Sequence, residues 1–281
     1  MGYQSLTSAR RTDLPRGRLT TARSSPHLVS RTLDSSLARW ISPLAIAALW
    51  QVCTASGLLS PDTLAAPSDI LSAAWRLITD GQLPDALAVS ARRAALGFVL
   101  GAGVALVLGS IAGLSKAGDA LVDPPMQMVR TLPLFGLVPL FIIWFGIGEA
   151  PKIALVAIGV VIPLYLNVIA ALRAIDRELY DVADVLRLTR WERVRDLLLP
   201  GALPGTLVGL RQSLGVAWLA LIVAEQVNAG SGLGYLINNA RDFNQTDVVV
   251  VGLLAYAVLG LLTDSLVRLF ERRALAWRDG S

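Results

Sequence analysis

Six stretches of this chain are rich in apolar residues, and polar or charged residues separate them. Each stretch approaches the ~20 mainly apolar residues that an α-helix needs to cross a bilayer. We therefore expect an all-α, polytopic membrane bundle of six transmembrane helices. Proline interrupts the third stretch, which membrane helices tolerate where neighbouring groups satisfy the freed carbonyls. The predicted spans are residues 37–58, 94–114, 128–147, 153–172, 203–227 and 248–270.

The first 36 residues have a different composition from the rest of the chain. They hold six Arg and many Ser and Thr but no apolar core, so they do not form a secretory signal. We interpret residues 1–36 as a flexible cytoplasmic tail and residues 37–278 as the transmembrane domain. An overextended start and an organellar transit peptide remain open as alternatives for the tail.

Composition and charge support a membrane location. The 281 residues are 54% hydrophobic and 16% charged, whereas soluble domains carry about 25% charged residues. With the N-terminus inside, alternating the six spans gives nineteen Lys and Arg residues on the cytoplasmic side and five outside. This asymmetry predicts both termini in the cytoplasm. It also explains the net charge of +4 without nucleic acid. The pair Arg92–Arg93, at an outer helix end, is the exception.

Glycine pairs four residues apart predict close contacts between helices. Small residues one turn apart allow membrane helices to approach each other closely. The pairs are Gly97 with Gly101, Gly109 with Gly113, and Gly205 with Gly209.

The residues that most enzymes and cofactor sites require are scarce. One cysteine, Cys53, and one histidine, His27, cannot form a disulfide or a Cys or His metal cluster. Neither lysine, Lys116 or Lys152, has the sequence context of a phosphate-binding P-loop. We predict no catalytic residue, no metal and no cofactor, and we expect any ATP hydrolysis to come from a partner chain.

Charged residues are frequent between the fourth and fifth predicted spans. Residues 173–199 contain six Arg and six acidic residues, and their apolar residues recur at helical spacing. This pattern predicts two short amphipathic helices. Residue types alone leave two interpretations open, a solvated loop and a docking platform for a cytoplasmic partner.

The same segment resembles the EAA loop of binding-protein-dependent ABC import permeases, whose motif is E-A-A-x3-G-x9-I-x-L-P. Arg187 occupies the position of the motif glycine. Because Arg adopts positive φ less readily than Gly, we expect a more continuous connection between the two helices here. The matching positions are Asp181, Val182 and Ala183, then Leu197, then Leu199 and Pro200.

The resemblance extends over residues 37–278. The runs LPGALPGTLVGLRQSLGVAWLALIVAEQV and GSGLGYLINNARDFNQTDVVVVGLLAYAVLG are similar to permeases of the nitrate, taurine and aliphatic-sulfonate branch, most of all to aliphatic-sulfonate permeases. The resemblance implies a permease of the inner membrane that forms a homodimer. It also implies cytoplasmic ABC ATPase subunits on the loop and an extracytoplasmic substrate-binding protein on the outer face.

Three charged residues fall within predicted spans, where charge is costly and points to function. Arg211 and Glu225 lie in the fifth span, about 21 Å apart along a helix, so they cannot pair with each other. Asp264 in the sixth span is the expected partner of Arg211. Each of the three either lines the substrate path or has a structural role, and an anionic substrate favours Arg211 as the contact.

Other readings compete with the permease. A stand-alone secondary transporter or channel would leave the charged loop unexplained and would need coupling residues near the midplane. A membrane-embedded enzyme would need a cluster of reactive groups that this sequence does not supply. Residues 231–246, between the last two spans, suit either an outer gate or binding-protein contact or a plain connection.

Overall fold

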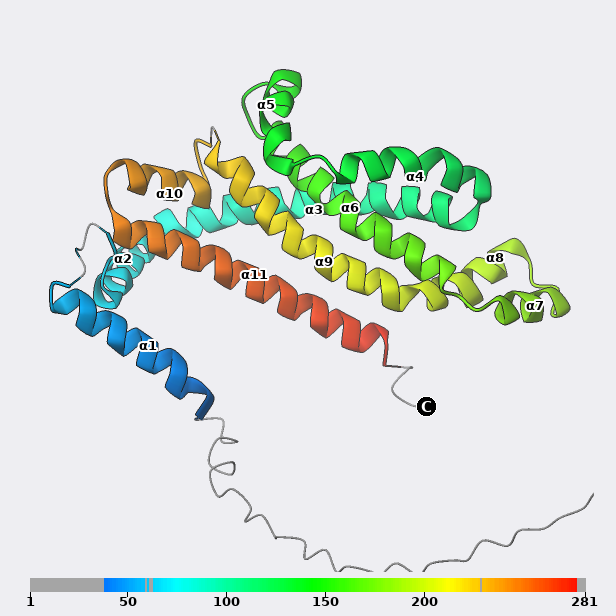
Figure 1. Ribbon diagram of the computed structural model, residues 1–281, viewed down its shortest axis with the longest axis horizontal. Helices are drawn as coiled ribbons and strands as arrows, with labels where there is room; N and C mark the ends of the chain where they lie inside the picture. The colour runs from blue at the N-terminus through cyan, green and yellow to red at the C-terminus, as the bar shows by residue number, and fades with distance from the viewer. Residues whose placement is uncertain (1–37, 59, 61–62, 228, 277–281) are drawn as a thin grey trace, which may run out of the picture. The chain divides into compact units, whose positions relative to one another are not determined.

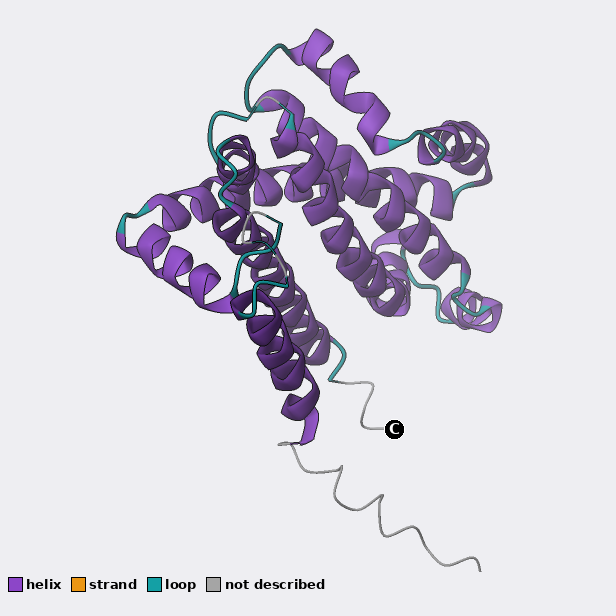
Figure 2. Cartoon of the chain, turned by 60° about the vertical axis from the view of Figure 1, so that its left-hand side comes forward, coloured by secondary structure: helices purple, strands orange, loops and turns teal. Residues whose placement is uncertain are grey.

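A computed structural model describes residues 38–58, 60, 63–227 and 229–276. Within these ranges the chain forms helices and loops but no strand, as Figure 2 shows, which confirms the all-α class. The chain divides into two compact units between Ala48 and Leu49, inside helix α1 (Ala38–Ala55). The predicted tail, residues 1–36, lies outside the described residues. The unit that starts at Leu49 contains helices α2 to α11.

Four helical segments of the described chain are long and apolar enough to cross a membrane. They are α3 (Gln82–Leu114), α6 (Ala150–Arg173), the run Arg190–Gln226 that contains α9 (Leu199–Gln226), and α11 (Thr246–Ala274). Helix α3 has 33 residues, so it spans about 50 Å and exceeds the ~30 Å hydrocarbon core. Its N-terminal turns therefore extend beyond the predicted span.

The prediction that the third span is a single helix is wrong. Helix α4 (Lys116–Arg130) and helix α5 (Leu134–Phe145) meet at an angle of 104°. Proline disfavours helical geometry in the residue before it, and Pro133 stands at the break, preceding α5. The pair passes as one broken span or as a re-entrant loop, which raises the number of spans to five at most.

The first predicted span is also shorter than expected. Its apolar helical part, Ile41–Ala55, has fewer residues than a membrane-crossing helix needs. The predicted count of six spans is therefore not confirmed by the described residues.

Helices α3, α6 and α9 pack closely at the predicted glycines. A Cβ atom on Gly101 would lie 2.3 Å from the carbonyl oxygen of Ala157 in α6, which is closer than real contacts allow. On α9, a Cβ on Gly205 would lie 2.6 Å from the Ala171 side chain. The small residues thus bring helix backbones together, as the sequence predicted.

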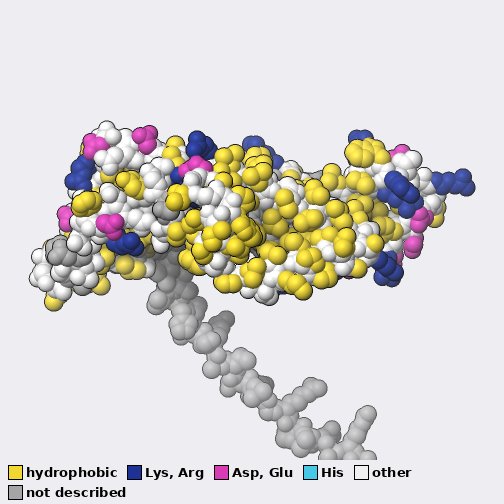
Figure 3. All heavy atoms as spheres, turned by 90° about the horizontal axis from the view of Figure 1, so that it is seen from above, with side chains coloured by type: hydrophobic (Ala, Val, Ile, Leu, Met, Phe, Trp, Pro, Cys, Tyr) yellow, Lys and Arg dark blue, Asp and Glu magenta, His cyan; other side chains and the backbone are white. Residues whose placement is uncertain are grey.

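The remaining short helices gather at the two ends of this bundle. Helix α2 (Pro67–Thr79) and helix α10 (Leu233–Asp242) lie near the start of α11, whereas α7 (Arg177–Val185) and α8 (Arg190–Glu192) lie where α6 ends and α9 begins (Figure 1). In the face drawn in Figure 3, hydrophobic side chains cover much of the surface and charged side chains lie mainly toward the two ends. Such an apolar exterior suits contact with lipid.

Candidate docking loop and buried charge cluster

The charged segment folds as two short helices joined by a tight turn. Asp176 caps α7 by accepting a hydrogen bond from the Glu178 backbone N–H. The first three motif positions lie on this helix: Asp181 and Val182 are exposed, and Ala183 is buried. Helix α7 thus holds one small residue against protein and presents the others to the outside.

Arg187 adopts the conformation of the glycine that it replaces. Its φ is +53°, in the left-handed region that Gly adopts most readily. The Leu188 N–H donates to the Ala183 carbonyl at 3.0 Å, and the Arg187 N–H donates to the Asp184 carbonyl at 3.0 Å. These two bonds form a Schellman motif, which ends α7. The expectation of a more continuous connection is therefore wrong, because helix-end hydrogen bonds outweigh the backbone preference of Arg.

The second short helix is fixed by a capping box and by Arg193. The Thr189 side chain accepts from the Glu192 N–H, and the Glu192 carboxylate accepts from the Thr189 N–H at 2.7 Å. Arg193 donates to the Leu188 carbonyl at 3.1 Å and forms an ion pair with Asp184. These contacts tie α8 to the end of α7.

From α8 the chain continues without a break into α9. The motif residue Leu197 is half-buried against the core, Leu199 is exposed, and Pro200 lies in the first turn of α9. The predicted motif residues therefore belong to one element that ends in a long apolar helix. Exposed large apolar side chains cluster on this element: Leu179, Val182, Val185, Leu186 and Trp191.

The predicted partners Arg211 and Asp264 form an ion pair between α9 and α11. The Arg211 Nε donates to the Asp264 Oδ1 at 2.7 Å. The other oxygen of Asp264 lies 2.9 Å from Arg268 Nη2, one turn further along α11. This part of the sequence prediction is confirmed, and the contact joins the two helices.

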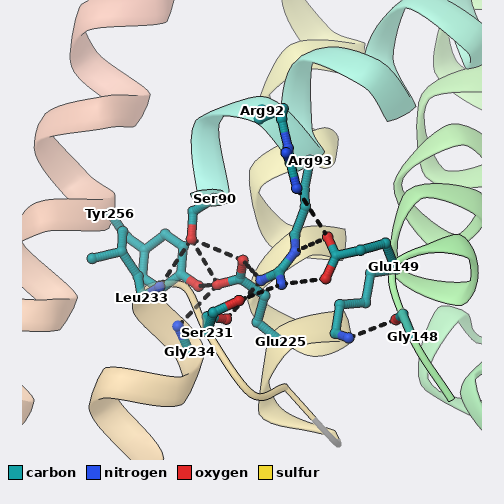
Figure 4. Close-up of polar contacts among 11 residues, drawn as sticks. Ser90, Arg92, Arg93, Gly148, Glu149, Glu225, Ser231, Leu233, Gly234 and Tyr256 are labelled. Atoms are coloured by element: carbon teal, nitrogen blue, oxygen red, sulfur yellow. Dashed lines mark hydrogen bonds and ion pairs between the residues drawn. The ribbon is translucent and has the colours of Figure 1, made fainter. Parts of the chain in front are cut away.

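Glu225, the third predicted intramembrane charge, lies in a buried polar cluster (Figure 4). Its side chain is 0% exposed. One oxygen accepts from Arg93 Nη1 at 2.7 Å, and the other accepts from the Tyr256 hydroxyl at 2.6 Å and the Gly234 N–H at 2.9 Å. Ser90 donates to this carboxylate at 2.8 Å and accepts from the Leu233 N–H at 2.9 Å.

Arg93 completes the cluster, and sequence reasoning did not identify it. Its side chain is 1% exposed. Nε and Nη2 donate to the two oxygens of Glu149 at 2.6 Å, and the remaining donors reach Glu225 and the backbone and side chain of Ser231. All five guanidinium donors thus have acceptors. The one signal for Arg93 in the sequence was that the Arg92–Arg93 pair lies at an outer helix end, against the excess of Lys and Arg on the cytoplasmic side.

The cluster joins five parts of the chain at the end of the bundle opposite α7 and α8. These are α3, the segment before α6, α9, the segment leading into α10, and α11. The hydrogen bonds of Glu149 to Arg93 hold the pKa of that carboxyl below its ordinary value. Because every donor of Arg93 is occupied, the cluster suits a structural clamp rather than a site for solute.

Comparisons with known proteins define the class. Residues 105–275 match the family described as binding-protein-dependent transport system inner membrane component. The chain belongs to this family, and it is a multi-pass inner-membrane permease subunit of an ABC transporter.

Its relatives include permease proteins named for aliphatic sulfonates and for taurine. The chain is 46% identical to the "Putative aliphatic sulfonates transport permease protein SsuC" of Bacillus subtilis (strain 168), over 84% of this chain and 86% of that protein. It is also 46% identical to the protein of the same name in Escherichia coli (strain K12), over 86% and 92%. The taurine transport system permease protein TauC of Escherichia coli (strain K12) is more distant, at 30% identity over 89% and 97%.

A solved structure shares the fold. The crystal structure of an amino acid ABC transporter with histidines matches with a TM-score of 0.60 at 18% identity, over 70% of this chain and 96% of that one.

Proposed function

We propose that this protein is the membrane-spanning subunit of an importer for aliphatic sulfonates, and that two copies form the path. Cytoplasmic ABC ATPase subunits bind the element formed by α7, the turn at Arg187 and α8. An extracytoplasmic binding protein delivers the solute to the opposite end. The protein itself does not hydrolyse ATP.

The geometry of the α7–α8 element carries this proposal. The element presents exposed apolar side chains, among them Leu186 and Trp191, on a segment otherwise rich in charge. Apolar patches with a polar rim mark protein–protein contacts. Internal hydrogen bonds hold the element together, and its continuity with α9 lets it transmit a rigid-body motion into the bundle.

The charge distribution supports one orientation of the chain in the membrane. The arginine-rich α7–α8 end belongs in the cytoplasm, as do both termini, and the end with α10 belongs outside. In this orientation the ATPase and the binding protein act on opposite ends of the bundle. The substrate assignment rests on relatives at 46% identity whose names refer to aliphatic sulfonates.

A pull-down of the solubilised full-length protein with its ATPase subunit tests the docking site. The variant Asp181→Lys with Leu186→Glu reverses one charge and places another on the apolar patch, so we expect capture to be lost. The matched control is Asp242→Lys with Phe243→Glu, which makes the same changes at an exposed acid and an exposed aromatic residue of the opposite end.

The comparison of the two variants decides the outcome. Capture by the wild type and the control but not by the loop variant supports the proposal, provided that all three elute as folded protein. Absence of capture even by the wild type would favour a stand-alone transporter. Equal capture by both variants would place the docking site elsewhere.

A further inference from the structure

A cavity of about 410 Å³ lies among α4, α5, α6 and α9. Its volume falls within the roughly 300–1,000 Å³ typical of small-molecule sites. Most of its wall is aliphatic, with Leu137, Ile158 and Val216 among the lining residues. The fully bonded cluster around Arg93 lies elsewhere and does not contribute to this wall.

The polar part of the wall favours an anion. Arg130 lines the cavity, no Asp or Glu does, and Arg130 has no ion-pair partner among the residues that the structure describes. Asn167 and Gln212 line the same space, and the Asn167 Nδ2 donates to the Gln212 Oε1 at 3.0 Å. That bond occupies the Gln212 oxygen and leaves its two amide N–H donors without a partner in the described chain. A guanidinium and an amide donor therefore face one apolar space.

The backbone around the cavity supports the same conclusion. The break between α4 and α5 contributes Leu132 to the wall, and the first turn of α5 contributes Leu134. Non-helical backbone at membrane depth is tolerated where it is buried in protein or lines a cavity. Broken membrane helices commonly form solute sites, with helix N-termini favouring anionic groups.

We propose that this cavity binds the transported anion, a small organic acid with a short aliphatic tail. Arg130 and the Gln212 amide hold the charged head group, and the aliphatic wall receives the tail. The identity of the anion as a sulfonate rests on the proposed function above. Bidentate donation by a guanidinium suits the oxygens of a tetrahedral anionic group.

Direct binding to the purified full-length protein tests this site without the partner subunits. Isothermal titration with butanesulfonate is compared with titration by butanol, which has the tail but no charge. We expect saturable binding of the sulfonate alone. In Arg130→Ala and in the isosteric Gln212→Glu, affinity should fall by about tenfold or more, because each substitution removes at least one hydrogen bond to a charged group.

Two further variants separate a binding role from a structural one. Arg130→Lys keeps the charge but not the planar fork, so it should recover part of the affinity. Arg272→Ala removes an exposed arginine of α11 that does not line the cavity and should bind like the wild type. If Arg130→Ala fails to elute as folded protein, Gln212→Glu decides.

Several results would overturn the inference. The first is that the wild type shows no saturable binding of butanesulfonate. The second is that Arg130→Ala or Gln212→Glu binds butanesulfonate with the same affinity as the wild type. A third is Arg130-dependent binding of phosphatidylglycerol in nanodiscs without any binding of sulfonate, which would assign the cavity to a lipid head group. Failure here together with normal capture of the ATPase would leave the permease role intact, whereas loss of ATPase capture would count against that role.

Discussion

Burial of Arg93 and Glu225 removes two charges from water, which is costly unless the pair is fully hydrogen-bonded. The structure meets that condition with Ser90, Tyr256 and the Gly234 N–H around Glu225, and with Glu149 beside Arg93. Each bond joins a different segment of the chain. The free energy of this cluster therefore depends on all its members together.

Removing one member leaves the other charge buried and unpaired. We predict that Arg93→Met lowers the free energy of unfolding by about 3–5 kcal/mol. The double variant Arg93→Met with Glu225→Gln should be less destabilised than the sum of the two single variants, because neither charge remains. Thermal unfolding in detergent measures both effects.

Arg92, next to Arg93 in the sequence, provides the control for these variants. Arg92 is 66% exposed and lies 3.9 Å from Glu149, so Arg92→Met should change stability by less than about 1 kcal/mol. Equal destabilisation by the two substitutions would show that the Arg93 ion pairs do not carry the effect.

A second prediction at the residue scale concerns Arg187. Left-handed backbone costs a residue with a side chain about 1–2 kcal/mol, and Arg187 bears this cost at φ +53°. Arg187→Gly should therefore raise the thermal midpoint. Arg195→Gly, in a helical segment of the same region, should lower the free energy of unfolding by about 0.5–1 kcal/mol and with it the thermal midpoint. A lower midpoint for Arg187→Gly would mean that its side chain, rather than its backbone, stabilises the turn.

At the scale of helices, glycines that meet another backbone differ from glycines that face open space. Gly101 and Gly103 lie on the same helix, but a Cβ on Gly101 would clash with the Ala157 carbonyl, whereas nothing lies within 4 Å of a Cβ on Gly103. Gly101→Ala should therefore destabilise the bundle by about 1–3 kcal/mol. Gly103→Ala should be neutral or slightly stabilising, by up to ~1 kcal/mol, from helix propensity.

The unfolding midpoints of these two variants test whether close packing holds α3 against α6. If Gly101→Ala and Gly103→Ala had the same unfolding midpoint, α3 and α6 could move apart without loss of stability. The glycine contact would then not determine their distance.

The lengths of the apolar runs and the spacing of the glycines predicted part of the fold. Hydropathy located α6, α9 and α11 because their apolar runs are long, and spacing alone identified the close glycine contacts. The break between α4 and α5 was missed because a run containing Pro133 is as apolar as a straight span, and its bend depends on what surrounds it. The length of an apolar run predicts whether a segment can cross a bilayer, but it does not predict where that segment bends.

The sites divide in a similar way. Arg211 and Asp264 could be paired from sequence because both were expected at the same depth in spans that follow each other. Arg93 could not be paired with Glu225, which is 132 residues away, without knowing that α3 extends beyond the apolar run. The turn at Arg187 was mispredicted because residue preference was weighed without the two hydrogen bonds that close α7.

At the scale of the whole molecule, the proposed mechanism requires that the α7–α8 element and the α10 end face opposite sides of the membrane. The rigid clamp at one end and the docking element at the other are joined by α9, which contains Glu225 near its C-terminus and follows α8 directly at its N-terminus. A motion of the docking element therefore reaches the opposite end through one continuous helix. This connection operates only in a chain oriented with α7 and α8 inside.

Cysteine labelling tests the orientation, since Cys53 is the one cysteine of the chain and Cys53→Ser removes it. Two exposed arginines then serve as matched reporters: Arg195 beside α8, 73% exposed, and Arg241 in α10, 68% exposed. In intact cells a membrane-impermeant maleimide should label Arg241→Cys and not Arg195→Cys, whereas permeabilised cells should label both. The reverse pattern would place the docking element outside, where no ATPase can reach it, and would refute the proposed coupling even if the fold is unchanged.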